Sequence, residues 1–138
     1  MTTLTLSTES RILAGAILLT VVTIAFGGWF LSRVVRGHVE MTPFQAAFAR
    51  AGHAHAGVLV TLGLVGLLYA DATGLSGVPL WIARLGVPVS AALISAGFFL
   101  SSLGKGTTRP NKLIILVWLG ALSLCAGVVA LGIGLITA

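Results

Sequence analysis

Two histidines separated by one residue are the most chemically informative feature of the sequence. His53 and His55 lie between Arg50 and Gly57, in a stretch whose other residues are all alanine or glycine. Neutral imidazole is a common metal ligand and the usual axial ligand of membrane b-type haems. The pair therefore predicts a cofactor site, for haem b or for a transition metal. The structural alternative is that both rings hydrogen-bond to backbone carbonyls or to hydroxyl groups of neighbouring helices.

The spacing of the two histidines predicts that they do different things. Two residues on an α-helix are separated by about 200° of rotation, so the two rings point to nearly opposite faces. The face of His53 continues through Ala56 and Gly57, whereas the face of His55 continues through Val58. We expect His53 to face the interior of a helix bundle and His55 to face a second groove, a partner or lipid headgroups.

A haem or metal ion held by His53 needs further ligands. His55, or His38 in the preceding loop, could assist, and so could another copy of the chain or an open coordination position. The other three long apolar segments contain no histidine, which argues against a haem held by two histidines inside one chain.

The Gly-His-Ala-His stretch around His53 and His55 resembles the His-x-His start of a helix in small bacterial membrane proteins of the haem-copper-oxidase-like kind, including uncharacterised four-helix families. The resemblance implies a haem, copper or quinone connection. Such oxidases carry histidines on several helices, and this chain does not. Catalytic oxygen reduction is therefore not implied, and no catalytic residue is predicted.

The composition shows what kind of protein must position these histidines. Of the 138 residues, 57% are hydrophobic and 8% are charged, whereas soluble domains carry about 25% charged residues. The mean hydropathy is +1.11. This composition excludes a soluble enzyme, and the net charge of +5 is interpreted as a topology signal and not as a nucleic-acid patch. The sequence predicts an all-α integral membrane protein.

Four segments are long enough to cross a bilayer, which needs about 20 apolar residues per helix. We predict one transmembrane four-helix domain over residues 1–138, with spans near 12–32, 43–70 (membrane part 51–70), 80–103 and 113–136. Thr42, Pro43 and Gln45 form a helix-start signal ahead of the second span. Pro88 leaves two alternatives for the third span, a single kinked helix or a short interfacial helix followed by the span.

The basic residues predict how the chain is oriented. Two loops hold most of them, and by the positive-inside rule both loops face the cytoplasm while both termini face outwards. The residues concerned are Arg33, Arg36, Arg50, Lys105, Arg109 and Lys112. The predicted location is the bacterial cytoplasmic (inner) membrane.

Small residues on two spans predict close helix packing. Ala126, Ala130 and Gly134 recur at four-residue intervals and are expected to contact another helix. On the second span the corresponding residues are Gly52, Ala56 and Gly57. These contacts fit packing within one chain, a homo-oligomer or a larger partner.

Two charges are expected on the outer side of the membrane. Asp71 and Arg84 could form an ion pair there, or Arg84 could extend to the interface as an anchor. The acidic residues all lie at or beyond the ends of spans, which argues against a proton-coupled transporter.

Three functions follow from these observations. The favoured one is a small non-enzymatic accessory or assembly subunit that packs in the lipid bilayer against a larger, for example respiratory, membrane complex. The first alternative is a haem- or metal-binding redox protein that uses His53 with His55 or His38. The second alternative is a small-solute carrier.

Overall fold

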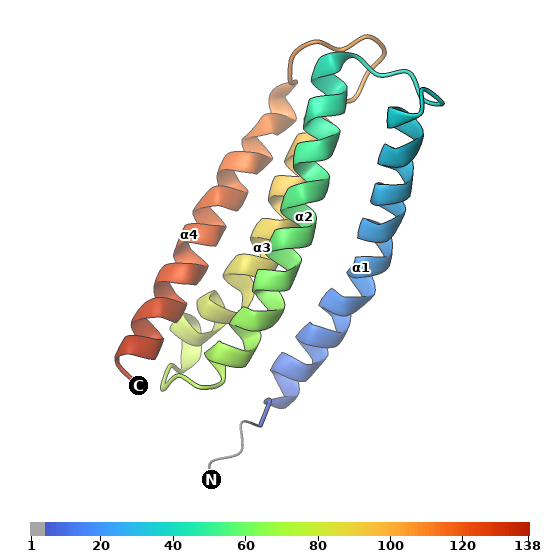
Figure 1. The fold of residues 1–138 in the computed structure, drawn as a ribbon. Coiled ribbons are helices and arrows are strands. Elements are labelled where there is room, and N and C mark those ends of the chain that lie inside the picture. The colour runs from blue at the N-terminus through green and yellow to red at the C-terminus, as the bar shows by residue number, and fades with distance from the viewer. Residues whose placement is uncertain (1–4) are drawn as a thin grey trace.

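Four long helices run side by side along most of the chain (Figure 1). This computed structural model describes residues 5–138, and its elements are α1 (Thr8–Val35), α2 (Pro43–Ala70), α3 (Gly77–Ser101), the short 3-10 helix η1 (Lys112–Ile114) and α4 (Ile115–Ile136). Each long helix is long and apolar enough to span a membrane. The prediction of an all-α, four-helix membrane protein is confirmed.

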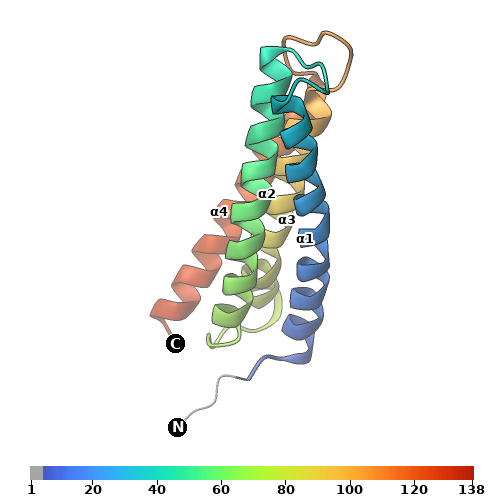
Figure 2. The same cartoon turned by 45° about the vertical axis from the view of Figure 1, so that its right-hand side comes forward.

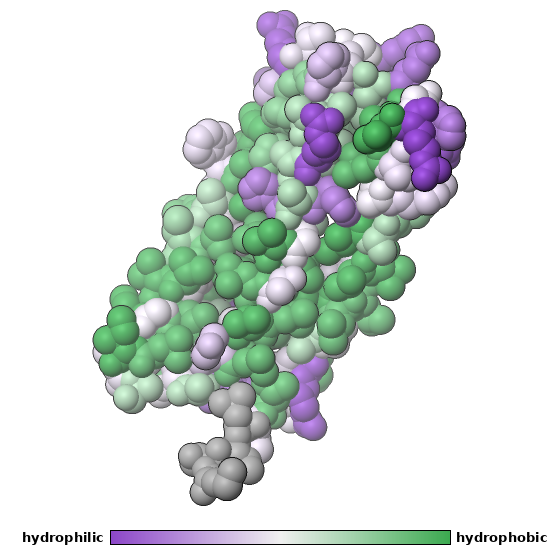
Figure 3. Space-filling model, in the orientation of Figure 1, coloured by the Kyte–Doolittle hydropathy of each residue, from purple (hydrophilic) through white to green (hydrophobic). Residues whose placement is uncertain are grey.

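The helices form an antiparallel bundle with its polar groups at the two ends. The α1–α2 and α3–α4 loops meet at one end, and the C-terminus lies at the other end (Figure 1). Apolar residues dominate the band between the two ends, and strongly hydrophilic residues gather mainly at the loop end (Figure 3). Helices α1 and α4 lie on opposite sides of the α2–α3 pair in both views (Figures 1 and 2). Both basic loops are therefore at the same end, which the positive-inside rule assigns to the cytoplasm.

The start of α2 follows the predicted signal. The Thr42 hydroxyl accepts a hydrogen bond from the Gln45 amide at 3.1 Å, and the Gln45 side-chain oxygen accepts one from the Thr42 amide at 3.2 Å. This reciprocal pair is a capping box, with Pro43 at the first helical position. The Gln45 side chain also donates to the carbonyls of Ser102 and Gly104, so the start of α2 holds the α3–α4 loop in place.

Helix α3 continues through its internal proline. It runs unbroken from Gly77 to Ser101 with Pro88 inside it, so the single-helix alternative is correct and there is no separate interfacial helix. The ring of Pro88 packs against Gly63 of α2, where an added Cβ would lie 3.3 Å from the proline Cγ.

Glycines bring α3 and α4 into backbone contact. A Cβ added to Gly127 would lie 2.8 Å from the Cα of Gly86, and a Cβ added to Gly120 would lie 2.9 Å from the backbone nitrogen of Ile94. The hydroxyl of Ser123 donates to the Gly86 carbonyl at 2.9 Å. These contacts leave no room for side chains and allow extensive van der Waals contact, which is what holds helices together in lipid.

Within the chain, α4 packs largely through residues other than Ala126, Ala130 and Gly134, whose contact with a partner helix stays a prediction. Ala126 is exposed and Ala130 is half-buried; of that set only Gly134 is buried, against Leu75 and Thr73 of the α2–α3 loop. The buried residues are instead Gly120, Gly127 and Gly134, which are spaced by seven. Seven residues end about 20° short of two full turns, whereas each four-residue step drifts by about 40°. A seven-residue repeat therefore stays on one side of a long antiparallel contact.

The small residues of α2 also divide into two groups. Gly52 is buried, and a Cβ there would lie 3.0 Å from the ring of Phe99 on α3. Ala56 is half-buried, and an added Cβ at Gly57 would meet no atom within 4 Å. Of the glycines predicted to pack, Gly52 makes a helix contact within the chain and Gly57 does not.

The glycine contact yields a stability prediction. Gly127→Ala places a methyl group against the backbone of Gly86, and we expect a loss of about 1–3 kcal/mol in the free energy of unfolding, as for other overpacked sites. The matched control is Gly132→Ala on the same helix, where an added Cβ meets nothing within 4 Å. Unfolding in mixed micelles with increasing SDS measures both. If both variants unfold at the same SDS fraction, Gly127 is not in tight contact with the backbone of Gly86.

Candidate functional site

His53 lies where α1 packs against the half of α2 nearest the basic loops. Its half-buried ring packs against two glycines of α1. A Cβ added to Gly27 would lie 3.2 Å from the ring Nδ1, and one added to Gly28 would lie 3.4 Å from Cε1. The missing side chains of this Gly-Gly pair create the space that the imidazole occupies.

The other side of His53 borders an open hollow on the surface of α2. The hollow has a volume of about 470 Å³ and is lined by His53, Ala54, Gly57, Val58 and Thr61. The proton of the Thr61 hydroxyl is already engaged in a hydrogen bond to the Gly57 carbonyl at 2.9 Å. Within residues 5–138, no group hydrogen-bonds to the His53 ring. The hollow thus places two small residues, Ala54 and Gly57, together with Val58 and Thr61 beside an unpaired imidazole.

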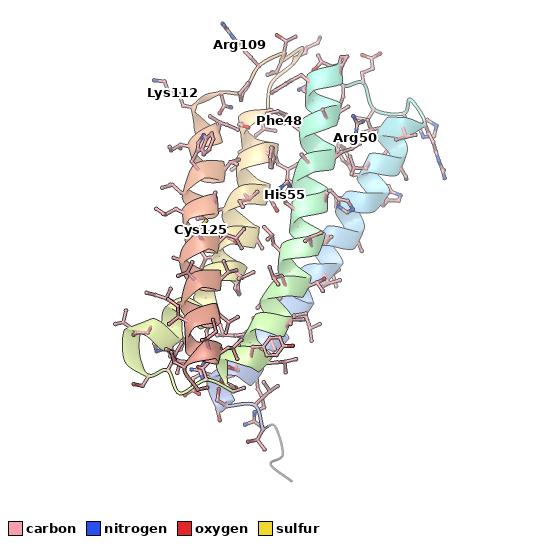
Figure 4. The ribbon with its side chains drawn as sticks, turned by 60° about the vertical axis from the view of Figure 1, so that its left-hand side comes forward. Phe48, Arg50, His55, Arg109, Lys112 and Cys125 are labelled. Atoms are coloured by element: carbon pink, nitrogen blue, oxygen red, sulfur yellow. The ribbon has the colours of Figure 1, made fainter. Side chains whose placement is uncertain are left out.

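His55 points to a different neighbour. Its Nδ1 lies 2.8 Å from the Ala51 carbonyl, and because a carbonyl only accepts hydrogen bonds, Nδ1 carries the proton. The lone pair of the exposed ring is then on Nε2. The ring centroid lies 5.2 Å from that of Phe98 on α3, and Phe48 contacts the same phenylalanine edge-on at 5.3 Å. Phe48 and His55 lie along one side of α2 in Figure 4.

The structure therefore separates the three histidines. His53 faces α1, His55 lies beside α3, and His38 is exposed in the α1–α2 loop. In the part of the chain that the structure describes, no three His, Cys, Asp or Glu side chains come together as metal ligands would. Ligation by His53, His55 or His38 stays a prediction, and any further ligand for one ion would have to come from outside this arrangement.

A second polar site lies at the opposite end of the bundle. Arg84 and Asp71 form an ion pair of 2.7 Å, with only 7% and 5% of their side chains exposed. Arg84 is therefore not an anchor that extends to the membrane interface; it is buried, with its guanidinium 5.5 Å from the Trp81 ring. A polar cavity of about 380 Å³ adjoins the pair.

The ion pair holds the beginning of α1. Asp71 accepts hydrogen bonds from the Ser7 amide at 2.7 Å and from the Ser10 hydroxyl at 2.9 Å, and Arg84 donates to the Ser7 hydroxyl at 2.9 Å. We call these four residues (Ser7, Ser10, Asp71 and Arg84) the outer latch. Ser7 and Ser10 were not among the residues predicted from the sequence. The signal that could have revealed Ser7 is its capping position, since its hydroxyl accepts from the Ser10 amide at the start of α1.

The latch also sets the ionisation of its carboxyl group. Burial raises the pKa of Asp71, but the bonds from Arg84, Ser7 and Ser10 to the carboxylate outweigh burial and hold the pKa below its ordinary value. Asp71 is therefore an anion at neutral pH, matched to the Arg84 cation.

Comparison of the chain with protein-family models, with curated proteins and with solved structures finds no match. Its function must accordingly follow from the chemistry of the His53 hollow, the His55 ring and the outer latch.

The latch predicts a pH-dependent stability. Asp71→Asn leaves the buried Arg84 without a counter-charge, so we expect a loss of about 3–5 kcal/mol in the free energy of unfolding at neutral pH. Because the carboxyl pKa is lowered on folding, its stabilisation is complete at neutral pH and declines as the pH falls below the ordinary aspartate value. Denaturant unfolding in detergent at several pH values should show this decline for the native chain and not for Asp71→Asn. The control is Glu40→Gln, an exposed acid; equal stability of both variants would refute the latch.

Proposed function

We propose that this chain is a small accessory or assembly subunit of a larger bacterial inner-membrane complex, such as a respiratory complex, and that the His53 hollow receives a transmembrane helix of that complex. The observation that carries the proposal is the hollow itself, an open space of about 470 Å³ on the bilayer-facing surface of α2. Small residues at a helix surface permit the close approach on which helix association in lipid depends.

The hollow differs from the surface around it. Elsewhere the bundle presents large apolar side chains to the bilayer, with Leu19 and Val22 of α1 and Trp118 of α4 each about 70% exposed. At the hollow the surface is lower at Ala54 and Gly57, beside the exposed side chain of Val58. Flexible lipid chains can cover a surface of bulky apolar side chains. A hollow instead favours a partner helix whose side chains are complementary to it in shape.

His53 adds a polar requirement to this fit. Its ring has no hydrogen-bond partner within residues 5–138, and an unpaired polar group facing hydrocarbon is unfavourable. A partner helix that carries a hydroxyl, amide or carboxyl group opposite His53 would satisfy the ring. Such interhelical hydrogen bonds contribute about 0.6–2 kcal/mol each, which favours one orientation of the partner.

Filling the hollow tests this proposal. Gly57→Leu places a large side chain where an added Cβ meets no atom of residues 5–138 within 4 Å, so we expect the variant to fold normally but to lose its stoichiometric partner. The matched control is Gly15→Leu on α1, another glycine with nothing within 4 Å. Affinity purification from native membranes in mild detergent, with quantitative mass spectrometry, measures the loss.

If Gly57→Leu and Gly15→Leu retain the same co-purifying proteins in the same ratio, the hollow is not a partner site. If the lost partner is a second tagged copy of this chain, the hollow is a homo-oligomer interface and the accessory role is wrong.

A second function, ligation of haem or of a transition metal, is favoured by a specific feature of the two rings. His53 has no partner on either nitrogen within the described chain, and His55 donates through Nδ1 to the Ala51 carbonyl, which leaves Nε2 as a ligand atom. Histidine ligands usually donate their second N–H to a carbonyl or a carboxylate in this way. The imidazole of His53 would hold the haem, which would supply electron-transfer chemistry.

An absorption spectrum tests ligation. The protein is produced with haem supplied, solubilised gently, and recorded in oxidised and dithionite-reduced forms. A Soret band that shifts on reduction and disappears in His53→Ala, but persists in His38→Ala, would establish haem ligation by His53. A featureless spectrum from the folded native chain would remove haem from the proposal, and metal analysis of the same sample would decide whether a colourless ion is bound instead.

The position of the acidic residues does not support a small-solute carrier driven by protons. The acid nearest to the bundle interior, Asp71, is engaged by Arg84, Ser7 and Ser10 in the outer latch.

A further inference from the structure

A separate cavity lies inside the bundle, where α1 meets α2 and α3. Its volume is about 280 Å³, and its wall is mostly apolar. Three hydroxyl-bearing residues also contribute to the wall, Thr20 and Thr23 from α1 and Ser95 from α3. Thr20 and Thr23 are near the middle of α1, and Ser95 is six residues before the end of α3, so the cavity is within the hydrocarbon region of a spanning bundle.

Ser95 is the unusual member of this wall. Its hydroxyl oxygen is buried and has no hydrogen-bond partner among residues 5–138. Other serines of the same helix donate to backbone carbonyls: Ser90 to Val87 at 2.7 Å and Ser101 to Phe98 at 3.4 Å. A buried hydroxyl without a partner costs about 1–3 kcal/mol, so its position calls for an explanation. Because it has no bond to lose, this hydroxyl is free to turn towards the cavity that its own residue lines.

The opposite wall offers complementary groups. The hydroxyls of Thr20 and Thr23 donate to the carbonyls of Ile17 and Thr20, each at 2.6 Å. Their protons are therefore committed, and their oxygen lone pairs can still accept. A turn of the Ser95 side chain would thus give the cavity an uncommitted donor on α3, opposite the acceptors on α1.

The cavity opens sideways towards lipid. Thr20 and Thr23 on α1 and Ala92 on α3 all line it and are all exposed, so its mouth lies between these two helices. A ligand would enter from the bilayer and must be lipid-soluble. The size suits one substituted ring, since a cavity of about 150 Å³ is enough for benzene.

We propose that this cavity binds a lipid-soluble molecule with a hydroxylated ring, of the phenol or quinol class. A ring hydroxyl can do both things that the walls require, accepting a hydrogen bond from Ser95 and donating one to Thr20 or Thr23. The site is distinct from the His53 hollow and does not depend on the proposed partner. Water could also bond to these groups, and the experiment separates the two occupants.

The test uses 4-octylphenol as the probe and octylbenzene as its counterpart without a hydroxyl. Native mass spectrometry of the purified full chain, released from detergent micelles, counts bound probe across a titration. We expect one saturable 4-octylphenol per chain and binding of octylbenzene at least tenfold weaker. Ser95→Ala, which removes only the hydroxyl, should weaken 4-octylphenol binding about tenfold, the equivalent of one buried hydrogen bond. Thr20→Val, which keeps the side-chain shape, should weaken it by a smaller factor because Thr23 offers a second acceptor.

Two further variants make the result decisive. Ser90→Ala is the matched control, because it removes a hydroxyl of the same helix that bonds to Val87, and it should bind 4-octylphenol as the native chain does. Ser95→Leu fills the cavity and should abolish binding. Equal binding of the two probes, equal affinity of Ser95→Ala and Ser90→Ala, or no saturable binding at all would overturn the proposal and leave the cavity to water or lipid chains.

Discussion

Backbone contact through glycine is the constraint on which the packing of this bundle depends. In a bilayer, apolar side chains gain little by leaving lipid for another helix, so association relies on close contact. Gly86 with Gly127 and Gly120 with Ile94 bring α3 and α4 together, and Gly52 and Gly63 admit α3 against α2. Helix α3 thereby becomes the centre of the bundle, and half of the residues in its 18-residue apolar stretch are buried.

Helix α1 is held in a different way. Only 6% of the residues in its 18-residue apolar stretch are buried. Its firmest attachment is polar, because the outer latch binds Ser7 and Ser10 to the Asp71–Arg84 pair. Towards the other end, Gly27 and Gly28 pack against the ring of His53. Between these two attachments the helices do not close, and the cavity with Ser95 occupies the space. The loose fit of one helix thus accounts for an internal site that a tightly packed bundle would lack.

This arrangement places the polar chemistry of the protein at three depths. The outer latch is at one end, the cavity lined by Thr20, Thr23 and Ser95 is nearer the middle, and His53 is in the half of α2 nearest the basic loops. Asp71 has its partners within the chain, whereas His53 and Ser95 have none among residues 5–138 and each line a space that could admit one. In hydrocarbon an unpaired polar group is unfavourable, so the spaces beside His53 and Ser95 are where partners or ligands are expected.

The sequence by itself determined the membrane class, the number of spans, the capping box at Thr42 and the different directions of His53 and His55. These features depend on hydropathy and on helical periodicity, which neighbouring residues specify. Only the tertiary structure showed which small residues make contacts, since Ala126 and Gly127 are adjacent in sequence and only Gly127 is buried. It also decided the outer latch, where Ser7 and Asp71 are 64 residues apart, and the cavity to which three helices contribute. Contacts between distant residues depend on how the helices rotate and cross, and local periodicity leaves both undetermined.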